Sequence, residues 1–228
     1  MRANHRGRSP FSRTRGTRSL LLVAALAGLL AAGRGWAAPV VTGWAVCVEH
    51  GGVGEVVTPV TNGYCEARTA GVATFAVTFD QAMDTSVTDP AVVAVAGVDG
   101  GDLSAMVTTV AWVSETEMRI RLSGPLPDAD TYAISLSKAV RSAGGEALGG
   151  DRGVAFVVLA GDVSGDGDVD NGDMIQVRNH RGEAVTAATA RYDVNANGSI
   201  NNGDMIAVRN CRGNGPLSEP APVTAEAG

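Results

Sequence analysis

Alternating apolar and polar positions run through residues 40–159 and predict a series of short β-strands. The clearest case is 117–122, where Met118, Ile120 and Leu122 alternate with charged residues. Such alternation is typical of a strand with one buried and one solvated face. Similar patterns predict strands at 41–48, 55–60, 72–79, 91–97, 105–113, 132–136 and 153–159, with a hairpin turn at 114–116. We therefore expect an antiparallel β-sandwich over residues 39–160.

From residue 161 the pattern changes to an internal duplication. The segment 162–173 returns as 193–204, and NGDMI at 171–175 returns at 202–206. Each copy then continues into nearly the same helix and keeps the same apolar residues, namely Met174, Ile175 and Val177 and their counterparts. A solvated Gly/Asp linker, the alternative, would not keep these apolar positions twice. Residues 161–217 are therefore predicted to form a small all-α module of two loop–helix units.

Both repeated segments have the ligand spacing of a calcium loop. Calcium takes six to eight oxygen ligands, and a twelve-residue loop supplies them from positions 1, 3, 5, 7, 9 and 12, with glycine at position 6 for the turn. The sequence predicts two calcium ions, one in each loop. The expected ligands are Asp162, Ser164, Asp166, Asp168 (through its carbonyl), Asp170 and Asp173 in the first loop, and Asp193, Asn195, Asn197, Ser199 (through its carbonyl), Asn201 and Asp204 in the second.

The two loops differ in charge. The first has side-chain carboxylates at positions 1, 5, 9 and 12, whereas the second has them at positions 1 and 12 alone. Because more ligand charge gives tighter binding, we expect the first loop to hold calcium more tightly. At position 8, Val169 is expected to face the core and to pair with Ile200 of the other loop.

The duplicated units are EF-hand-like but lack an entering helix, because strand-like residues precede the first loop, and both close with Asp at position 12. This arrangement resembles the type I dockerin module over 161–217. The resemblance implies that a cohesin partner meets both helices. The contact residues carried over in this way are Asn171, Gly172, Arg178, Asn179, Asn202, Gly203, Arg209 and Asn210. They are identical between the repeats, which would let either helix meet the same partner surface. The alternative is that Arg178 and Arg209 lie on solvated helix faces.

The β region is similar to bacterial Ig-like domains. The matching segments are 75–84, Trp112 with 118–120, 129–134 and 143–148. The expected fold is therefore a mostly β Ig-like sandwich, followed by a small all-α dockerin-type module with two calcium loops.

The first 37 residues predict a secretory signal peptide. They are rich in arginine, contain the apolar run 20–32, and have small residues at positions 35 and 37. The apolar run is too short for the alternative, a membrane-spanning anchor. Seven of the 18 basic residues and none of the 24 acidic ones lie in this segment, so cleavage leaves a net charge of −13. Such a charge disfavours nucleic acid and anionic membranes as partners. The tail, 218–228, is expected to be disordered.

Cys47 and Cys65 lie in a chain expected to be exported, so we expect a disulfide between them. The alternative is two unpaired small residues in a core. Cys211 is left over and aligns with His180 of the first repeat.

No catalytic motif stands out in the β region, and His50 and Glu66 have no spaced partners that would complete a zinc site. The chain is therefore interpreted as a secreted bacterial protein that is not an enzyme, with no membrane insertion after signal cleavage. Its expected partner is a cohesin-like or other extracellular protein. One alternative is a calcium-stabilised structural or surface protein without a cohesin partner. Another is an enzyme or accessory protein in polysaccharide catabolism, within a polysaccharide-degrading assembly. Aromatic candidates for carbohydrate contact are Trp44, Tyr64, Trp112 and Tyr132.

Overall fold

The computed structural model describes residues 37–215. The expected signal peptide, apart from its last residue, and the expected tail lie outside the described residues. No helix in the described part of the chain is long and apolar enough to cross a membrane. The strands are β1 (Val41–His50), β2 (Gly54–Val60), β3 (Tyr64–Glu66), β4 (Thr74–Phe79), β5 (Val93–Gly97), β6 (Gly101–Asp102), β7 (Val107–Ser114), β8 (Glu117–Leu122), β9 (Asp130–Leu136) and β10 (Gly153–Val158). The helices are α1 (Asn171–Asn179) and α2 (Asn202–Cys211), with short 3₁₀ turns at Pro90–Val92, Ser104–Met106 and Ala190–Tyr192.

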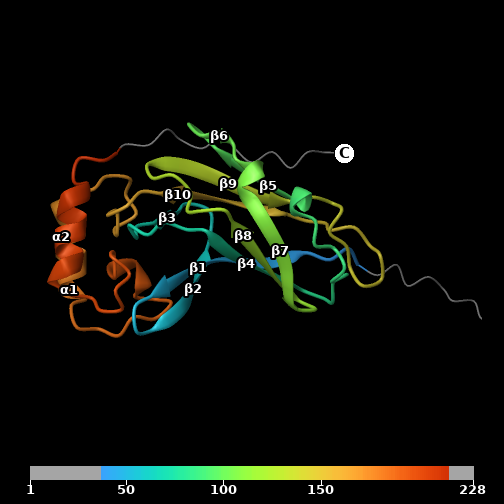
Figure 1. Ribbon diagram of the computed structural model, residues 1–228, viewed down its shortest axis with the longest axis horizontal. Helices are drawn as coiled ribbons and strands as arrows, with labels where there is room; N and C mark the ends of the chain where they lie inside the picture. Colours follow the sequence, from blue (N-terminus) through green and yellow to red (C-terminus); the bar gives the residue numbers. More distant parts are fainter. Residues whose placement is uncertain (1–36, 216–228) are drawn as a thin grey trace, which may run out of the picture. The chain divides into compact units, whose positions relative to one another are not determined.

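The strands form two five-stranded sheets within the described residues (Figure 1). One sheet has the order β2-β1-β4-β8-β7 and the other β3-β10-β9-β5-β6. Neighbours are antiparallel except β3 and β10, which are parallel. The expected hairpin joins β7 to β8, with Ser114 opposite Glu117. The predicted fold class, a mostly β Ig-like region followed by two short helices, is confirmed.

The main core lies between the sheets and is built from the alternating apolar positions of their strands. Phe75 and Phe156 meet across it with ring centroids 5.6 Å apart. Tyr132 is 1% exposed and donates its hydroxyl to the carbonyl of Pro127. Trp44 is also buried, and Tyr64 and Trp112 pack partly buried against the same core. The four aromatic candidates for carbohydrate contact therefore serve the packing of the sandwich.

A second core lies where the β region meets the two helices. Val177 of α1 and Val208 of α2 are fully buried in it, together with Val56, Cys65 and Leu159 from the β region. Only three residues, 159–161, separate the end of the last strand from the start of loop one at residue 162. Because apolar burial is the main favourable term in folding, the helical module depends on the β region to complete its core.

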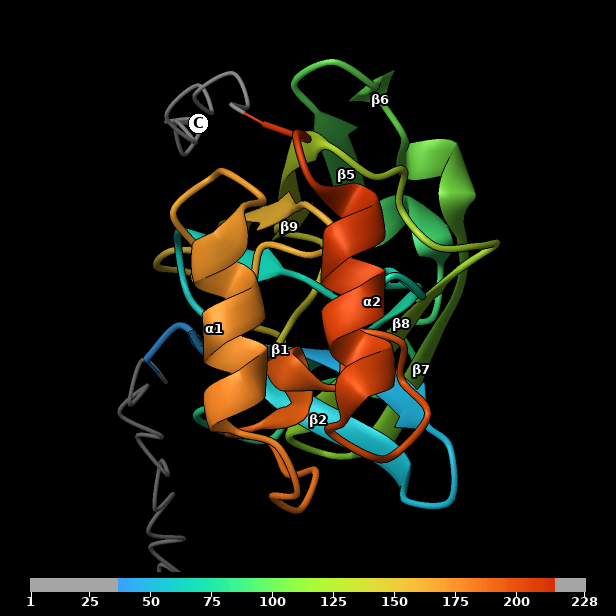
Figure 2. The same cartoon turned by 90° about the vertical axis from the view of Figure 1, so that its left-hand side faces the viewer.

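The helices lie side by side (Figure 2), and each loop contacts the chain that leaves the other helix. Gly182, after α1, donates its amide to the carbonyl of Ile200 at 2.9 Å. Gly213, after α2, donates to the carbonyl of Val169 at 3.1 Å. Val169 and Ile200 are both buried in the second core, as the sequence predicted, while their pairing with each other stays a prediction. The chain leaving each helix is therefore hydrogen-bonded to position 8 of the other loop.

The prediction of a disulfide between Cys47 and Cys65 is wrong, because both cysteines are unpaired. Cys47 lies on β1 in one sheet, and Cys65 lies on β3 in the other. Nη1 of Arg119 is 2.5 Å from the Cys47 sulfur. Burial raises the pKa of the Cys47 thiol to about 11, although the Arg119 charge opposes this shift. Proximity along the chain did not bring the two cysteines together, because the intervening turn crosses between the sheets.

Candidate calcium-binding module

Position 1 is an aspartate buried at the centre of each loop. In loop one (162–173), the Asp162 carboxylate accepts hydrogen bonds from the amides of Gly165 at 2.6 Å and Gly167 at 3.0 Å. In loop two (193–204), Asp193 accepts from the amide of Gly198 at 2.8 Å. Gly167 and Gly198 have φ angles of +92° and +86°, which favour glycine over any residue with a Cβ. The two loops therefore turn in the same way around the same carboxylate.

Position 12 closes each loop onto its helix. Asp173 accepts from the amides of positions 3 and 9 of loop one, both at 2.9 Å. Asp204 makes the same two bonds in loop two, at 3.1 and 2.8 Å. Position 9, which is Asp170 or Asn201, is the N-cap, and with position 12 it forms a capping box. Aspartate at position 12 thus both closes the loop and offsets the positive end of the helix dipole.

These central carboxylates suit a bound cation. Asp162, Asp173, Asp193 and Asp204 are each 0% exposed. Within the described residues, Asp193 bonds to an imidazole, whereas the other three make no ion pair. Desolvation raises the pKa of Asp204, and the charge of Asp193 adds to this shift. A buried carboxylate is costly unless it is paired or binds a metal, so the donor set fits calcium.

The remaining oxygen positions lie on the rim of each loop. Asp166 and Asp170 of loop one are exposed, and Asn197 at position 5 of loop two is exposed as well. No group of three or more His, Cys, Asp or Glu side chains that could hold a metal forms among residues 37–215. Such a group would leave out the serine, asparagine and backbone oxygens that calcium also accepts. Loop two has only two carboxylates, so it depends on those neutral oxygens.

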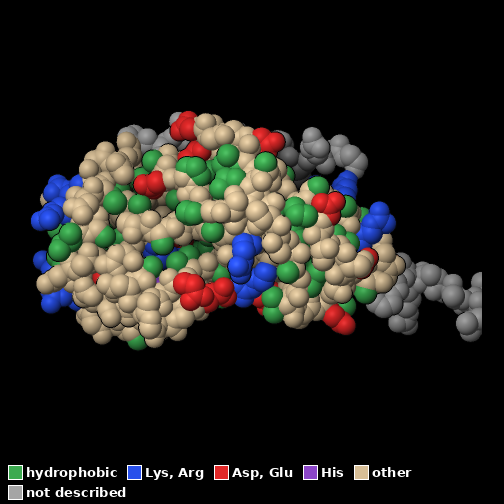
Figure 3. All heavy atoms as spheres, viewed as in Figure 1, with side chains coloured by type: hydrophobic (Ala, Val, Ile, Leu, Met, Phe, Trp, Pro, Cys, Tyr) green, Lys and Arg blue, Asp and Glu red, His purple; other side chains and the backbone are tan. Residues whose placement is uncertain are grey.

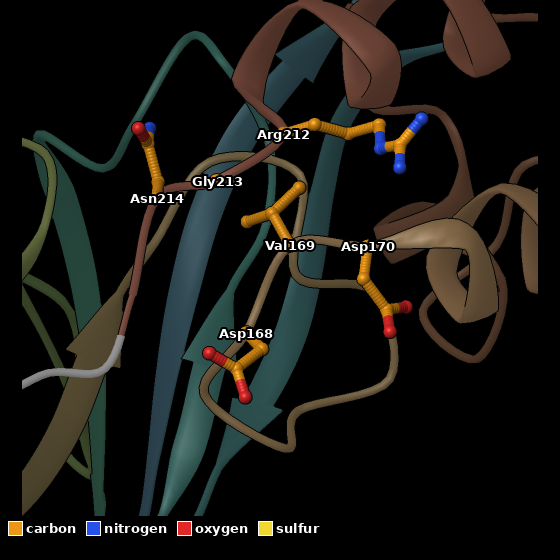
Figure 4. Close-up of a pocket in the computed structure, with 6 residues that line it drawn as sticks. All are labelled: Asp168, Val169, Asp170, Arg212, Gly213 and Asn214. Carbon is orange, nitrogen blue, oxygen red and sulfur yellow. The ribbon is translucent and has the colours of Figure 1, made fainter.

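An open hollow of about 500 Å³ lies beside loop one, between positions 7 to 9 and the chain leaving α2 (Figure 4). It is lined by Asp168, Val169, Asp170, Arg212, Gly213 and Asn214. Val169 donates its amide to the carbonyl of Asn214 at 3.1 Å. The residues after α2 therefore form one wall of the loop-one rim.

The residues expected to meet a partner lie on the outer surface of the two helices. Those exposed are Asn171, Gly172, Arg178, Asn179, Asn202, Arg209 and Asn210, while Gly203 is partly exposed. Figure 3 shows basic side chains with apolar atoms near them over α1 and α2.

Ile175 is 46% exposed and Ile206 is 49% exposed. Asp173 and Val177, four residues apart, define the buried face of α1. Ile175 is two residues from each, so it points away from that face. The spacing from position 12 could have shown this. Each helix therefore presents an isoleucine and, three residues later, an arginine to solvent.

Fold and site together define a β-sandwich that continues directly into a duplicated loop–helix module. A family model described as Dockerin type I domain matches residues 160–211, and one described as Bacterial Ig-like domain matches residues 56–158. The chain thus carries a bacterial Ig-like domain followed by a type I dockerin domain. Type I dockerin domains bind calcium and dock on cohesins, and both domain types are non-catalytic modules.

No curated protein matches the chain. Among solved structures, the N-terminal part of the bacterial S-layer protein SbsC is 15% identical, with a TM-score of 0.36, over 54% of this chain and 24% of that one. E. coli alpha-2-macroglobulin is 14% identical, with a TM-score of 0.35, over 54% and 6%. CopC from Methylosinus trichosporium OB3b is 11% identical, with a TM-score of 0.32, over 51% and 94%. The chain thus spans about a quarter of the SbsC structure it matches.

Proposed function

We propose that this chain is a secreted, non-catalytic protein whose dockerin domain binds two calcium ions and docks on a cohesin-type extracellular partner. The observation that carries the proposal is the repeated geometry. Two loops enclose buried carboxylates in the same hydrogen-bond pattern, and two helices behind them expose the same isoleucine and arginine. The ligand set is the one expected from positions 1, 3, 5, 7, 9 and 12 of each loop.

In this proposal calcium supplies the charge that balances the buried aspartates. The residues of this chain hold the loops closed around them through backbone amides, and the capping boxes join each loop rigidly to its helix. Calcium binding therefore orders the helices that carry Arg178 and Arg209. Docking should depend on calcium for this reason, since an unfolded module would not present the exposed face.

The docking proposal is tested by capturing recombinant cohesin domains on the immobilised full chain. We expect capture in calcium and its loss in excess chelator. Substituting both Arg178→Ala and Arg209→Ala should reduce capture, while Arg121→Ala, which removes an exposed arginine of β8, serves as the matched control. Capture that ignores both calcium and the double substitution contradicts the proposal.

A second candidate is a calcium-stabilised structural or surface protein without a cohesin partner. It is supported by the core shared between the β region and the helices, because a docking module alone would not need that contact. Calcium would then clamp the two parts together. Strong calcium stabilisation with no capture by any cohesin domain tested favours this second function over the first.

A role as an accessory protein in a polysaccharide-degrading assembly is a separate alternative that rests on the dockerin domain alone. The chain itself is proposed to turn over no polysaccharide, since its candidate aromatic side chains pack in or against the sandwich core. Incubation of the full chain with soluble and insoluble polysaccharides should release no reducing sugar. Measurable release of reducing sugar would identify an enzyme and contradict the proposed non-catalytic role.

A further inference from the structure

A fully buried row of charged and polar side chains joins the Ig-like domain to loop two. Glu66 and Arg68 form a two-pronged pair, with Nε 2.6 Å from Oε1 and Nη2 2.5 Å from Oε2. Nη1 of Arg68 lies 3.0 Å from Nε2 of His50. On the other side of the ring, Nδ1 of His50 lies 2.6 Å from Oδ2 of Asp193. None of these four residues is more than 2% exposed.

The direction of these hydrogen bonds is set by what each group can do. A guanidinium has donors only, so Nε2 of His50 must accept from Arg68. The ring proton is then on Nδ1, which donates to Asp193. Glu66 holds the Arg68 guanidinium in place through two bonds, which fixes the imidazole in turn. These four side chains therefore form a chain of hydrogen bonds with fixed donors and acceptors, and it ends on the position 1 carboxylate of loop two.

The hydrogen bonds to the Asp193 carboxylate leave one of its two oxygens able to bind a cation. Its Oδ2 accepts from both His50 and the amide of Gly198, which uses both lone pairs of that oxygen. Among the described residues, its Oδ1 accepts from the amide of Asn197 alone, at 3.1 Å. One lone pair on Oδ1 is thus left. His50 fixes the rotation of the carboxylate and so decides which oxygen is free.

Backbone bonds hold the rest of loop two to the same surface. Gly51, next to His50, donates its amide to the carbonyl of Ala196 at 2.9 Å. Thr69, next to Arg68, donates its amide to the carbonyl of Val194 at 2.8 Å and its hydroxyl to the same oxygen at 3.1 Å. Loop two is therefore anchored at positions 1, 2 and 4 by two segments of the Ig-like domain.

Loop one has no equivalent support among the residues that the structure describes. Asp162 accepts from amides and a hydroxyl of its own loop, and it makes no ion pair within residues 37–215. The thiol of Cys65 in the Ig-like domain interacts with Asp162. Burial raises the pKa of this thiol, and the charge of Asp162 and a hydrogen bond to it raise the pKa further. A thiol is a weak donor.

We propose that His50 is a positioning residue for calcium in loop two, so that the Ig-like domain completes this site. Arg68 and Glu66 hold His50, and His50 aims the Asp193 carboxylate. This inference rests on the proposed calcium binding of the module. It makes loop two, with only two carboxylates of its own, dependent on a residue 143 positions away in the chain.

The test is a calcium titration of the full chain by NMR, with a separate readout for each loop. The amides of Gly167 and Gly198 each donate to the position 1 aspartate of their own loop and so report the two sites separately. His50→Leu removes the donor to Asp193 and should weaken loop two about tenfold, as loss of a partner that orients a metal ligand does. Loop one should stay within about twofold and is the internal control.

Two amide variants make the result independent of any loss of stability in His50→Leu. His50→Asn places an amide N–H near the position of Nδ1 and should restore most of the loop-two affinity. His50→Gln places it near Nε2, away from Asp193, and should not. Equal affinities in these two variants overturn the proposal, as does His50→Leu weakening both loops alike or neither.

The wild-type titration separates this inference from the function on which it rests. If the Gly198 amide does not respond to calcium in the wild-type chain, calcium binding by loop two fails and the role of His50 fails with it. If Gly198 responds in the wild type and equally in His50→Leu, calcium binding stands and only the role of His50 is overturned.

Discussion

Loop one and loop two have the same backbone conformation, but different interactions stabilise it in each loop. Both loops close through hydrogen bonds from backbone amides to the aspartates at positions 1 and 12. Loop one has carboxylates at positions 1, 5, 7, 9 and 12 and draws its support from within the module. Loop two replaces three of these with neutral side chains and is held by His50 from the Ig-like domain. A duplication can thus preserve a fold while the energetics of its halves diverge.

Calcium removal should have the largest effect and should separate the loops. Chelation leaves five mutually repelling aspartates in loop one, whereas loop two has two and keeps its bonds to the Ig-like domain. We expect loss of helical signal in the module, with amide exchange rising more in loop one than in loop two. Hydrogen exchange with and without chelator measures this. Greater opening of loop two than of loop one would contradict this difference between the loops.

The glycines at position 6 offer a matched pair for the next effect. At Gly167 a Cβ would meet nothing within 4 Å, whereas at Gly198 it would overlap the Gly51 carbonyl oxygen. Gly167→Ala should cost about 1–2 kcal/mol from its backbone conformation alone. Gly198→Ala should cost about 1–3 kcal/mol more, because it pushes loop two away from the Ig-like domain. Chemical unfolding in calcium checks both, and equal losses would show that the contact at Gly51 contributes nothing.

Exchanging ligand charge should exchange the affinities of the loops. Asp166→Asn with Asp170→Asn gives loop one the position 5 and 9 ligands of loop two, and should weaken it about tenfold. Asn197→Asp with Asn201→Asp is the reverse exchange and should tighten loop two. Calorimetric titration of both double variants provides the measurement. If neither changes its site, charge count is not what distinguishes the loops.

The smallest effect is expected from a single arginine on the docking face. The exposed residues of α1 and α2 are the same in both repeats, so either helix should serve when the other is altered. Arg178→Ala or Arg209→Ala alone should change cohesin capture by about twofold, and the two together should do more than the sum. Surface plasmon resonance with each variant tests this. A single substitution that abolishes capture would show that only one helix docks.

Much of this structure was accessible from local patterns in the sequence. Alternation at Met118, Ile120 and Leu122 predicted β8, because one face of the strand is buried and the other is wet. The duplication predicted both helices, because a repeated ligand spacing constrains the backbone over twelve residues. The sequence did not predict β3, because a strand of three residues is too short to show an alternating pattern.

The contact of His50 with Asp193 had no local signal. It depends on how the end of β1 meets a loop far along the chain, and its partners Glu66 and Arg68 lie in a segment without periodicity. The unpaired state of Cys47 and Cys65 is non-local too, since it follows from which sheet β1 and β3 join. Local patterns predicted the two loops, whereas the difference between them comes from long-range packing.

The most direct test of two unequal calcium sites is the calcium titration of the wild-type full chain, followed at the amides of Gly167 and Gly198. Both signals should respond, with two calcium ions bound per chain, and Gly167 should saturate at lower calcium than Gly198. Two unequal calcium sites would be contradicted if neither amide signal responds to calcium, if a single ion binds, or if Gly198 saturates first.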